Sequence, residues 1–288
     1  MDVLSDVLNT LQLRSTNAES LVVESHYENT VPCQHTLAHV VLSGSCTLHV
    51  DGEKNNLTLY PLDSFLLCGA QQYELEVISR GNSAHLLKCY YSFEANLPHP
   101  FIDHFPALLV LRSNDLTDRT ELGQTASLLD DELVNARLGI DFVALKLAEI
   151  ILVELLRRCQ SEETQHVFLA ALADSVTHIA LQYIHGKPDY HWQVSELATS
   201  VGLSRSIFTE RFHQYVGEPP ARYARLWRLL KAYRELQSTT TSIKRIAERS
   251  GYSSSAGFSR AFQKFFGHPP SYLRLPSTEA RTRTATSG

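Results

Sequence analysis

The chain has 288 residues and a mass of 32.4 kDa, which is enough for two domains that each bury a core. A hydrophobic fraction of 43% and a charged fraction of 20% fit an ordinary soluble globular protein. The net charge of −5 conceals an asymmetry, because residues 187–275 hold 14 Lys and Arg against 6 Asp and Glu, whereas residues 1–186 hold 10 against 24. This basic C-terminal module predicts a polyanionic partner.

The first predicted element is an amphipathic helix over residues 1–14, where apolar side chains recur at spacings of three and four. Acidic residues stand where a secretory signal carries lysines, so we expect a cytoplasmic location. The five cysteines agree with a cytoplasmic location, because an odd number of cysteines without CxxC spacing fits reduced thiols better than a disulfide framework.

Short β-rich runs follow from Leu21 to Phe93. They are separated at residues 43–44, 51–52, 69 and 81, each of which includes a glycine that adopts positive φ at little cost. Many short strands at such spacing predict a β-sandwich or a small barrel. The Pro-rich passage ANLPHPFIDHFP then marks the end of this β-rich domain.

Helices are predicted next, over residues 123–136, 141–160 and 165–184. The second is the most apolar, but Lys146, Glu149 and Glu154 interrupt it, and it is too short and too charged to span a bilayer. It should therefore be buried or interfacial. The segment HGKPDYHW, with Gly186 and Pro188, is a plausible linker to the basic module.

The basic module contains a repeat. FHQYVGEPPARY begins at Phe212, and FQKFFGHPPSYL begins at Phe262. Each copy is preceded by an Ala four residues before a Gly, which lets two short helices pack closely and then turn. The pattern therefore predicts a helix-turn-helix in each unit.

Ser204 and Ser253 are the predicted N-caps of the second helix of each unit. The Gly of each Gly-x-Pro-Pro is its predicted C-cap. Phe208, Phe212 and Tyr215 are expected to face the core in the first unit; Phe258, Phe262 and one of Phe265 and Phe266 are expected to do so in the second.

Between the units, PPARYARLWRLLKAYRELQ is helical and amphipathic. A single helix that joins the two helix-turn-helix units, which we call the reading heads, would hold them about one turn of DNA, or about 34 Å, apart. Arg222, Arg225 and Arg228 are either a solvated helix face or phosphate contacts, and their charge favours at least one phosphate contact.

From about Trp192 to Arg274 the sequence resembles the AraC-type family of bacterial transcription regulators, through its tandem units, the joining helix and the terminal SRAFQKFFGHPPSYLR. The stretch HVVLSGSCTLHVDGEKNNLTLYPLDSFLL is similar to the cupin-type sensor domain of one branch of that family, although Leu62 and Tyr73 replace the usual Gly and His. The resemblance implies an α+β chain of two domains. A cupin-like β-barrel with a helical dimerisation segment would precede an all-α tandem helix-turn-helix.

The predicted boundaries are a cupin-like sensor over residues 1–120, a helical dimerisation segment over 121–186, a DNA-binding domain over 187–275 and a disordered tail over 276–288. Packing of the helical segment within one subunit stays an alternative to dimerisation.

The resemblance places base contacts at three positions in each recognition helix: Ser206, Thr209 and Glu210, then Ser255, Ala256 and Arg260. Arg260 is the best candidate chemically because a guanidinium pairs bidentately with guanine, whereas a phosphate contact or a brace to a neighbouring helix is the alternative. Glu210 could accept from cytosine or pair with Arg205 or Arg211. The full predicted DNA-binding set is Arg205, Ser206, Thr209, Glu210, His213, Arg222, Arg225, Ser254, Ser255, Ala256, Arg260 and Lys264.

A candidate effector pocket is predicted at Cys33, His35, His39 and Tyr73. The first three fall at even spacing, so a strand through them would place them on one face. Cys and His could hold a metal there, but no carboxylate accompanies them, so pocket lining is favoured and no metal or cofactor is predicted.

The prediction is a non-enzymatic, sequence-specific DNA-binding transcription regulator, more often an activator in this family, controlled by a small-molecule effector or a dimer contact. Promoter DNA, RNA polymerase and a second copy of the chain are the expected partners, and no membrane is expected. One alternative is a metal-dependent cupin enzyme fused to a DNA-binding module, and a second is an architectural DNA binder.

Overall fold

The computed structural model describes residues 2–33, 35–78, 83–94, 97–113, 118–159 and 167–274. The predicted disordered tail over 276–288 lies outside these residues, as does the predicted turn at Gly81. The chain divides into two compact units. The helical unit comprises residues 1–11, 96–104 and 171–288, and the sheet unit comprises residues 12–95 and 105–170. Each unit is thus assembled from separate stretches of sequence.

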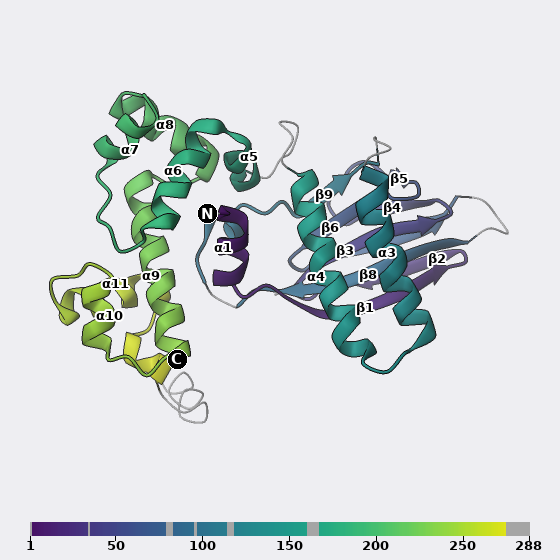
Figure 1. Ribbon diagram of the computed structural model, residues 1–288. Coiled ribbons are helices and arrows are strands. Elements are labelled where there is room, and N and C mark those ends of the chain that lie inside the picture. The colour runs from purple at the N-terminus through teal and green to yellow at the C-terminus, as the bar shows by residue number, and fades with distance from the viewer. Residues whose placement is uncertain are drawn as a thin grey trace. The chain divides into compact units, whose positions relative to one another are not determined.

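The sheet unit contains two antiparallel sheets (Figure 1). One has the strand order β1-β8-β3-β6-β9 and the other has the order β2-β7-β4-β5. The strands are β1 (Arg14–Val23), β2 (His26–Thr30), β3 (His35–Ser43), β4 (Cys46–Val50), β5 (Leu57–Leu59), β6 (Ser64–Cys68), β7 (Gln72–Val77), β8 (Ala84–Ser92) and β9 (Leu108–Leu111). In the described residues the sheets do not close into the single barrel that was expected.

The core of this unit lies between the two sheets. Leu37, Val41 and Phe65 of the larger sheet belong to one buried cluster with Leu48 and Leu75 of the smaller sheet. This alternation follows from the two-residue period of a strand. In β3 the intervening residues are buried as well, because its other face is also covered.

Two helices cover that other face, namely α3 (Asp118–Asn135) and α4 (Ile140–Arg158) (Figure 1). The hydroxyl of Tyr91 in β8 donates to the carbonyl of Ala148 in α4 at 2.7 Å, which fixes the helix against the sheet. The turn between α3 and α4 passes through Gly139 at a φ of 87°. The helix α4 matches its predicted position within two residues, whereas α3 begins at Asp118, five residues before the predicted start at 123.

The helical unit is built around one long helix, α9 (Pro220–Ser238), which contacts α8 on one side and α10 on the other (Figure 1). The remaining helices are α1 (Val3–Thr10), α2 (Pro100–Asp103), α5 (Val167–Ala173, across the unit boundary), α6 (Ser175–Gly186), α7 (Val194–Ser200), α8 (Arg205–Val216), α10 (Ile243–Arg249), α11 (Ser255–Phe266) and the 3₁₀ turn η1 (Pro270–Arg274). In the part of the chain described here, residues 187–274 contain no strand, as predicted.

Two other predicted elements differ from the structure. The first strand begins at Arg14 rather than Leu21, because β1 is an edge strand whose polar start pairs with β8 without being fully buried. The helix predicted over residues 165–184 is two helices. Asp174 separates them, since its carboxylate accepts from the amide of Thr177 at 2.8 Å and caps α6.

Candidate nucleic-acid interface

The first recognition helix is α8. Ser204 caps its start, and Gly217 ends it at a φ of 81°, as the sequence predicted. Phe208 and Phe212 are fully buried, which turns the opposite face of α8 to the surface. On that face a shallow groove of about 680 Å³ is lined by all five residues predicted for this helix, together with Pro219: Arg205, Ser206, Thr209, Glu210 and His213.

The second recognition helix is α11, which buries Phe258 and Phe262. Its N-cap is Ser254, whose hydroxyl accepts from the amide of Gly257 at 3.1 Å, so the predicted cap at Ser253 is wrong by one residue. The turn before α11 is one residue longer than the turn before α8, and this shifts the cap. Gly267 ends the helix at a φ of 78°.

Small and basic side chains share the outer face of α11. Ala256, Arg260 and Lys264 are exposed, whereas Ser255 is half-buried. The exposed residues recur every four positions and therefore form one stripe along the helix. This surface combines two cations with a small apolar contact, which suits a DNA groove.

The charges on the joining helix α9 divide into two groups. Arg222 and Arg225 are exposed, and Arg222 pairs with Glu218 at 3.0 Å. Arg228 is buried instead. Its guanidinium donates to the carbonyls of Pro188 and Tyr190, each at 3.0 Å. The suggestion that Arg228 contributes to a solvated face or contacts phosphate is therefore wrong, because this side chain ties the linker to α9.

Glu210 does not pair with either arginine proposed for it among the described residues. The guanidinium of Arg211 instead binds the carboxylate of Asp174, which caps α6. Glu210 thus stays on the groove surface together with His213.

In the sheet unit, the predicted effector residues fall in two places. His39 and Tyr73 are fully buried between the sheets, with Nε2 of His39 2.8 Å from the Tyr73 hydroxyl and its ring stacked on Phe65. Burial, helped by Lys88, lowers the pKa of His39 to about 3, and burial raises the pKa of Tyr73 well above its usual range. Both groups are therefore neutral near pH 7.

Cys33 lies outside the strand that was expected to carry it. It is exposed in the turn before β3, which begins at His35, so the two-residue alternation of a strand does not reach it. The ring of His35 lies edge-on to Tyr90, 6.3 Å between centroids, and the Tyr90 hydroxyl accepts from Asn29 at 2.8 Å. Asn29 also reaches the hydroxyl of Tyr73 at 3.4 Å, which links His35 to the His39–Tyr73 pair.

Lys88 is a member of this inner cluster that sequence reasoning missed. Its ammonium is 2.9 Å from the Tyr27 hydroxyl, 3.2 Å from a carboxylate oxygen of Glu19 and 5.0 Å from the centre of the Tyr90 ring. The available signal was a single lysine inside the apolar run LLKCYY of a predicted strand. An isolated charge in such a run is rarely buried without a partner.

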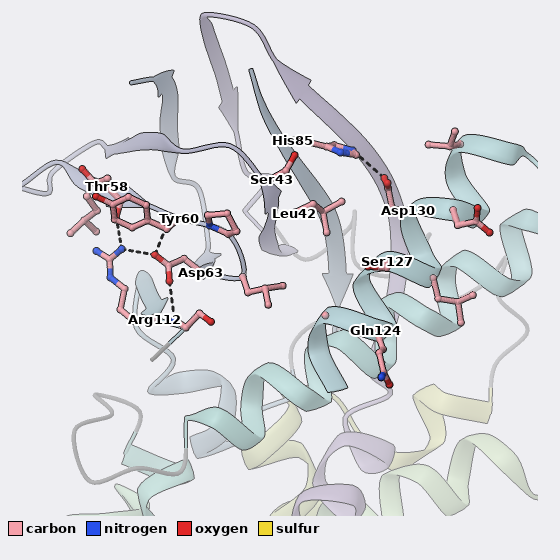
Figure 2. A pocket seen from close by; sticks show the side chains of 18 of the residues that line it. Leu42, Ser43, Thr58, Tyr60, Asp63, His85, Arg112, Gln124, Ser127 and Asp130 are labelled. Atoms are coloured by element: carbon pink, nitrogen blue, oxygen red, sulfur yellow. Dashed lines mark hydrogen bonds and ion pairs between the residues drawn. The ribbon is translucent and has the colours of Figure 1, made fainter. Parts of the chain in front are cut away.

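A separate open cavity of about 1,610 Å³ lies between the sheets' edge and α3 (Figure 2). Asp63, held by Arg112 at 2.9 Å, stands at one end, and the His85–Asp130 pair, 3.1 Å apart, stands at the other. Its walls include Tyr60 and Gln124. None of Cys33, His35, His39 and Tyr73 lines this cavity.

Over the described ranges, no group of three or more His, Cys, Asp and Glu side chains is arranged to hold a metal ion. Over the same ranges, no helix has the length and apolar character needed to cross a membrane.

Both halves of the chain are similar to known proteins. A family model described as a cupin matches residues 2–161, and one described as a helix-turn-helix domain matches residues 197–275. A protein of Streptomyces lividans described as an AraC-like transcription regulator is 30% identical over 305 residues, covering 96% of this chain and 99% of that protein. Another of the same description from Streptomyces antibioticus is 29% identical over 303 residues, with coverage of 96% and 99%.

Among solved structures, unsaturated fatty acid bound ToxT from Vibrio cholerae matches with a TM-score of 0.40 and 16% identity, covering 92% of this chain and 96% of that chain.

The two family models together define a DNA-binding regulator in which a cupin domain precedes a helix-turn-helix domain. The chain belongs to the AraC-like transcription regulators, which confirms the resemblance noted in the sequence.

Proposed function

We propose that this protein is a cytoplasmic transcription activator that reads promoter DNA through α8 and α11, contacts RNA polymerase and catalyses no reaction. The observation that carries the proposal is the matched pair of recognition helices. Each is capped by Ser and Gly, each buries two Phe, and each exposes polar or basic residues, while α9 joins them. Two such heads on one rigid helix suit two successive turns of the major groove.

The two heads would read DNA differently. In α8, Ser206, Thr209 and Glu210 offer hydrogen bonds, and Glu210 suits the amino group of cytosine. In α11, Arg260 supplies a bidentate contact to guanine, and Ala256 contacts a thymine methyl group. Arg205, His213, Arg222, Arg225, Ser254, Ser255 and Lys264 would position the protein on the phosphate backbone or at the groove edge.

Selection of bound fragments from the host genome at physiological salt tests the proposal. We expect a motif of two short blocks about one helical turn apart. Recovery of fragments with no shared motif would contradict sequence-specific regulation and indicate electrostatic binding alone. Transcription from a recovered promoter with purified RNA polymerase then separates activation from repression.

Arg260→Lys is expected to weaken binding to the selected site by roughly 1–3 kcal/mol and to relax the preference at one base pair, because lysine keeps the charge but loses the bidentate fork. Lys264→Ala, one turn further along α11, should instead weaken binding to all sequences and lower the salt slope by about one unit. Titrations against variant sites at several salt concentrations distinguish the two. An Arg260→Lys protein with unchanged base preference would make Arg260 a phosphate contact.

We propose that the chain forms a homodimer through the α3–α4 hairpin. Large apolar side chains are exposed there, including Val134, Leu138 and Phe142. The side chain of Phe142 is 71% exposed, and surfaces of this kind mark protein interfaces. A dimer would bring two pairs of reading heads to one promoter.

Phe142→Asp together with Leu138→Asp is expected to convert the dimer to a monomer, because buried carboxylates would be left without partners. Sedimentation equilibrium gives the measurement. Arg157→Ala, exposed near the C-terminal end of α4, is the control and should stay dimeric. A wild-type protein that is monomeric at micromolar concentration would exclude this interface.

We propose that an effector binds in the inner cluster of the sheet unit, at His35, His39 and Tyr73 with Cys33 at its edge. Lys88 would offer it a positive charge shielded from water. Tyr73→Phe, which removes only a hydroxyl, should abolish any effector-dependent change in DNA affinity while leaving the affinity without effector unchanged. An unaltered response of the variant would move the effector to the open cavity beside α3.

A further inference from the structure

The helical unit contains a buried chain of polar side chains in which none of the predicted DNA contacts takes part. His185 in α6 is at its centre and is 1% exposed. Its Nδ1 lies 3.0 Å from a carboxylate oxygen of Asp6 in α1, and its Nε2 lies 2.8 Å from the Tyr223 hydroxyl in α9. The same hydroxyl lies 3.3 Å from Nε2 of His99, whose Nδ1 accepts from the amide of Phe101 at 3.0 Å.

One arrangement of protons satisfies all of these contacts. The Asp6 carboxylate can only accept, so His185 donates from Nδ1 and accepts from Tyr223 at Nε2. Tyr223 then accepts from Nε2 of His99, which leaves Nδ1 of His99 to accept from the backbone. Burial lowers the pKa of both histidines, which agrees with two neutral rings.

Further contacts hold α1 on α9. Lys231 forms an ion pair with Asp6, and its ammonium lies 4.9 Å from the centre of the Trp227 ring. The ring of His185 in α6, which binds Asp6 of α1, stacks on Trp227 of α9 with 3.8 Å between centroids. Arg234 donates to the carbonyl of Thr10 at the end of α1. Every side chain on the α9 side of these contacts lies between the two helix-turn-helix units in sequence.

The two segments held on α9 are both continuous with the sheet unit. Residues 2–11 precede β1, which begins at Arg14, and residues 97–104 come after β8, which ends at Ser92. Those strands pair with each other, and their paired ends are Arg14 and Ser92. In sequence, both segments are therefore connected to the same end of one strand pair.

We propose that α1 and residues 97–104 form a clasp on α9, through which the sheet unit controls how firmly α9 holds the two recognition helices in register. The proposal rests on the DNA-binding function proposed above. With the clasp closed, α9 is braced and the reading heads keep a fixed separation. With the clasp open, Tyr223, Trp227 and His185 lose their cover, α9 is less constrained, and affinity for a two-block site falls.

The experiment uses the full-length protein and two substitutions. Asp6→Ala removes the partner of both His185 and Lys231, and Asn9→Ala, at an exposed position of the same helix, is the control. We expect amide hydrogen exchange of α1 and of residues 97–104 to accelerate together in Asp6→Ala. Affinity for the selected two-block DNA should fall by about fivefold or more, the lower end of usual couplings between sites, while affinity for a single block is unchanged.

Tyr223→Phe provides a second variant that keeps the packing and removes only the hydroxyl joining His185 to His99. It should accelerate exchange in residues 97–104 and lower two-block affinity in the same direction. The clasp is overturned if Asp6→Ala frees α1 while residues 97–104 and α9 keep their protection, or if both variants bind two-block DNA as the wild type does. If the wild-type protein selects no DNA motif, the proposed function is contradicted and not the clasp. Hydrogen exchange would still decide whether α1 and residues 97–104 open together.

Discussion

Arg228→Ala is expected to lower the free energy of unfolding of the helical unit by about 3 kcal/mol, and with it the fraction of protein able to bind DNA. Arg228 as a residue is 7% exposed, and its guanidinium donates hydrogen bonds to the carbonyls of Pro188 and Tyr190 and to Nε2 of His191, each at 3.0 Å. Alanine would leave the carbonyl oxygens of Pro188 and Tyr190 without these donors. Lysine should rescue little, because one ammonium cannot reproduce the planar fork.

The control is Arg225→Ala, almost one turn earlier on α9, where the side chain is exposed. This variant should keep the wild-type unfolding free energy and lose about one unit from the salt dependence of DNA binding. Both tryptophans, Trp192 and Trp227, lie in the helical unit, so their fluorescence follows its denaturation. If Arg228→Ala were as stable as Arg225→Ala and showed the same loss of salt dependence, Arg228 would be a phosphate contact after all.

Gly44→Ala should destabilise the sheet unit by about 3 kcal/mol or more. Gly44 has a φ of 74°, and a Cβ there would stand 2.2 Å from the carbonyl oxygen of Ser83 and 3.0 Å from the Cα of Ala84. Both are backbone atoms at the start of β8, so relief requires the strand to move. The left-handed backbone conformation adds its own cost for alanine.

Gly52→Ala separates these two effects. Its φ is 86°, but nothing lies within 4 Å of the added Cβ, so we expect a loss of only about 1 kcal/mol. Hydrogen exchange of amides in β3 and β8 under increasing urea measures both variants. Equal losses would show that the turn conformation, and not the contact with Ser83, determines the need for glycine at position 44.

The recognition helices could be predicted from sequence because their signals are local. The Phe spacing, the Gly before each Pro-Pro and the Ser before α8 each act within one or two turns of the helix they define. The cap of α11 was misplaced by one residue because both Ser253 and Ser254 are competent caps, and only the turn length decides between them.

Features that depend on residues far apart in the sequence could not be predicted from such local signals. Arg228 looked like a surface cation because the linker residues that cover it lie about 40 positions earlier. Asp6 and His185 are 179 residues apart, and neither stands in a motif. Cys33 fits the alternation of a strand, yet it precedes the strand, because periodicity does not fix where pairing begins.

The discontinuous helical unit constrains the order in which the protein can fold during synthesis. Residues 2–11 and 97–104 leave the ribosome before α6 and α9, whose side chains they bind. The sheet unit, complete by residue 170, can fold first, since domains generally form as they emerge. A fragment that begins at the linker would lack Asp6 and His99 altogether, and it would present Tyr223 and Trp227 to water.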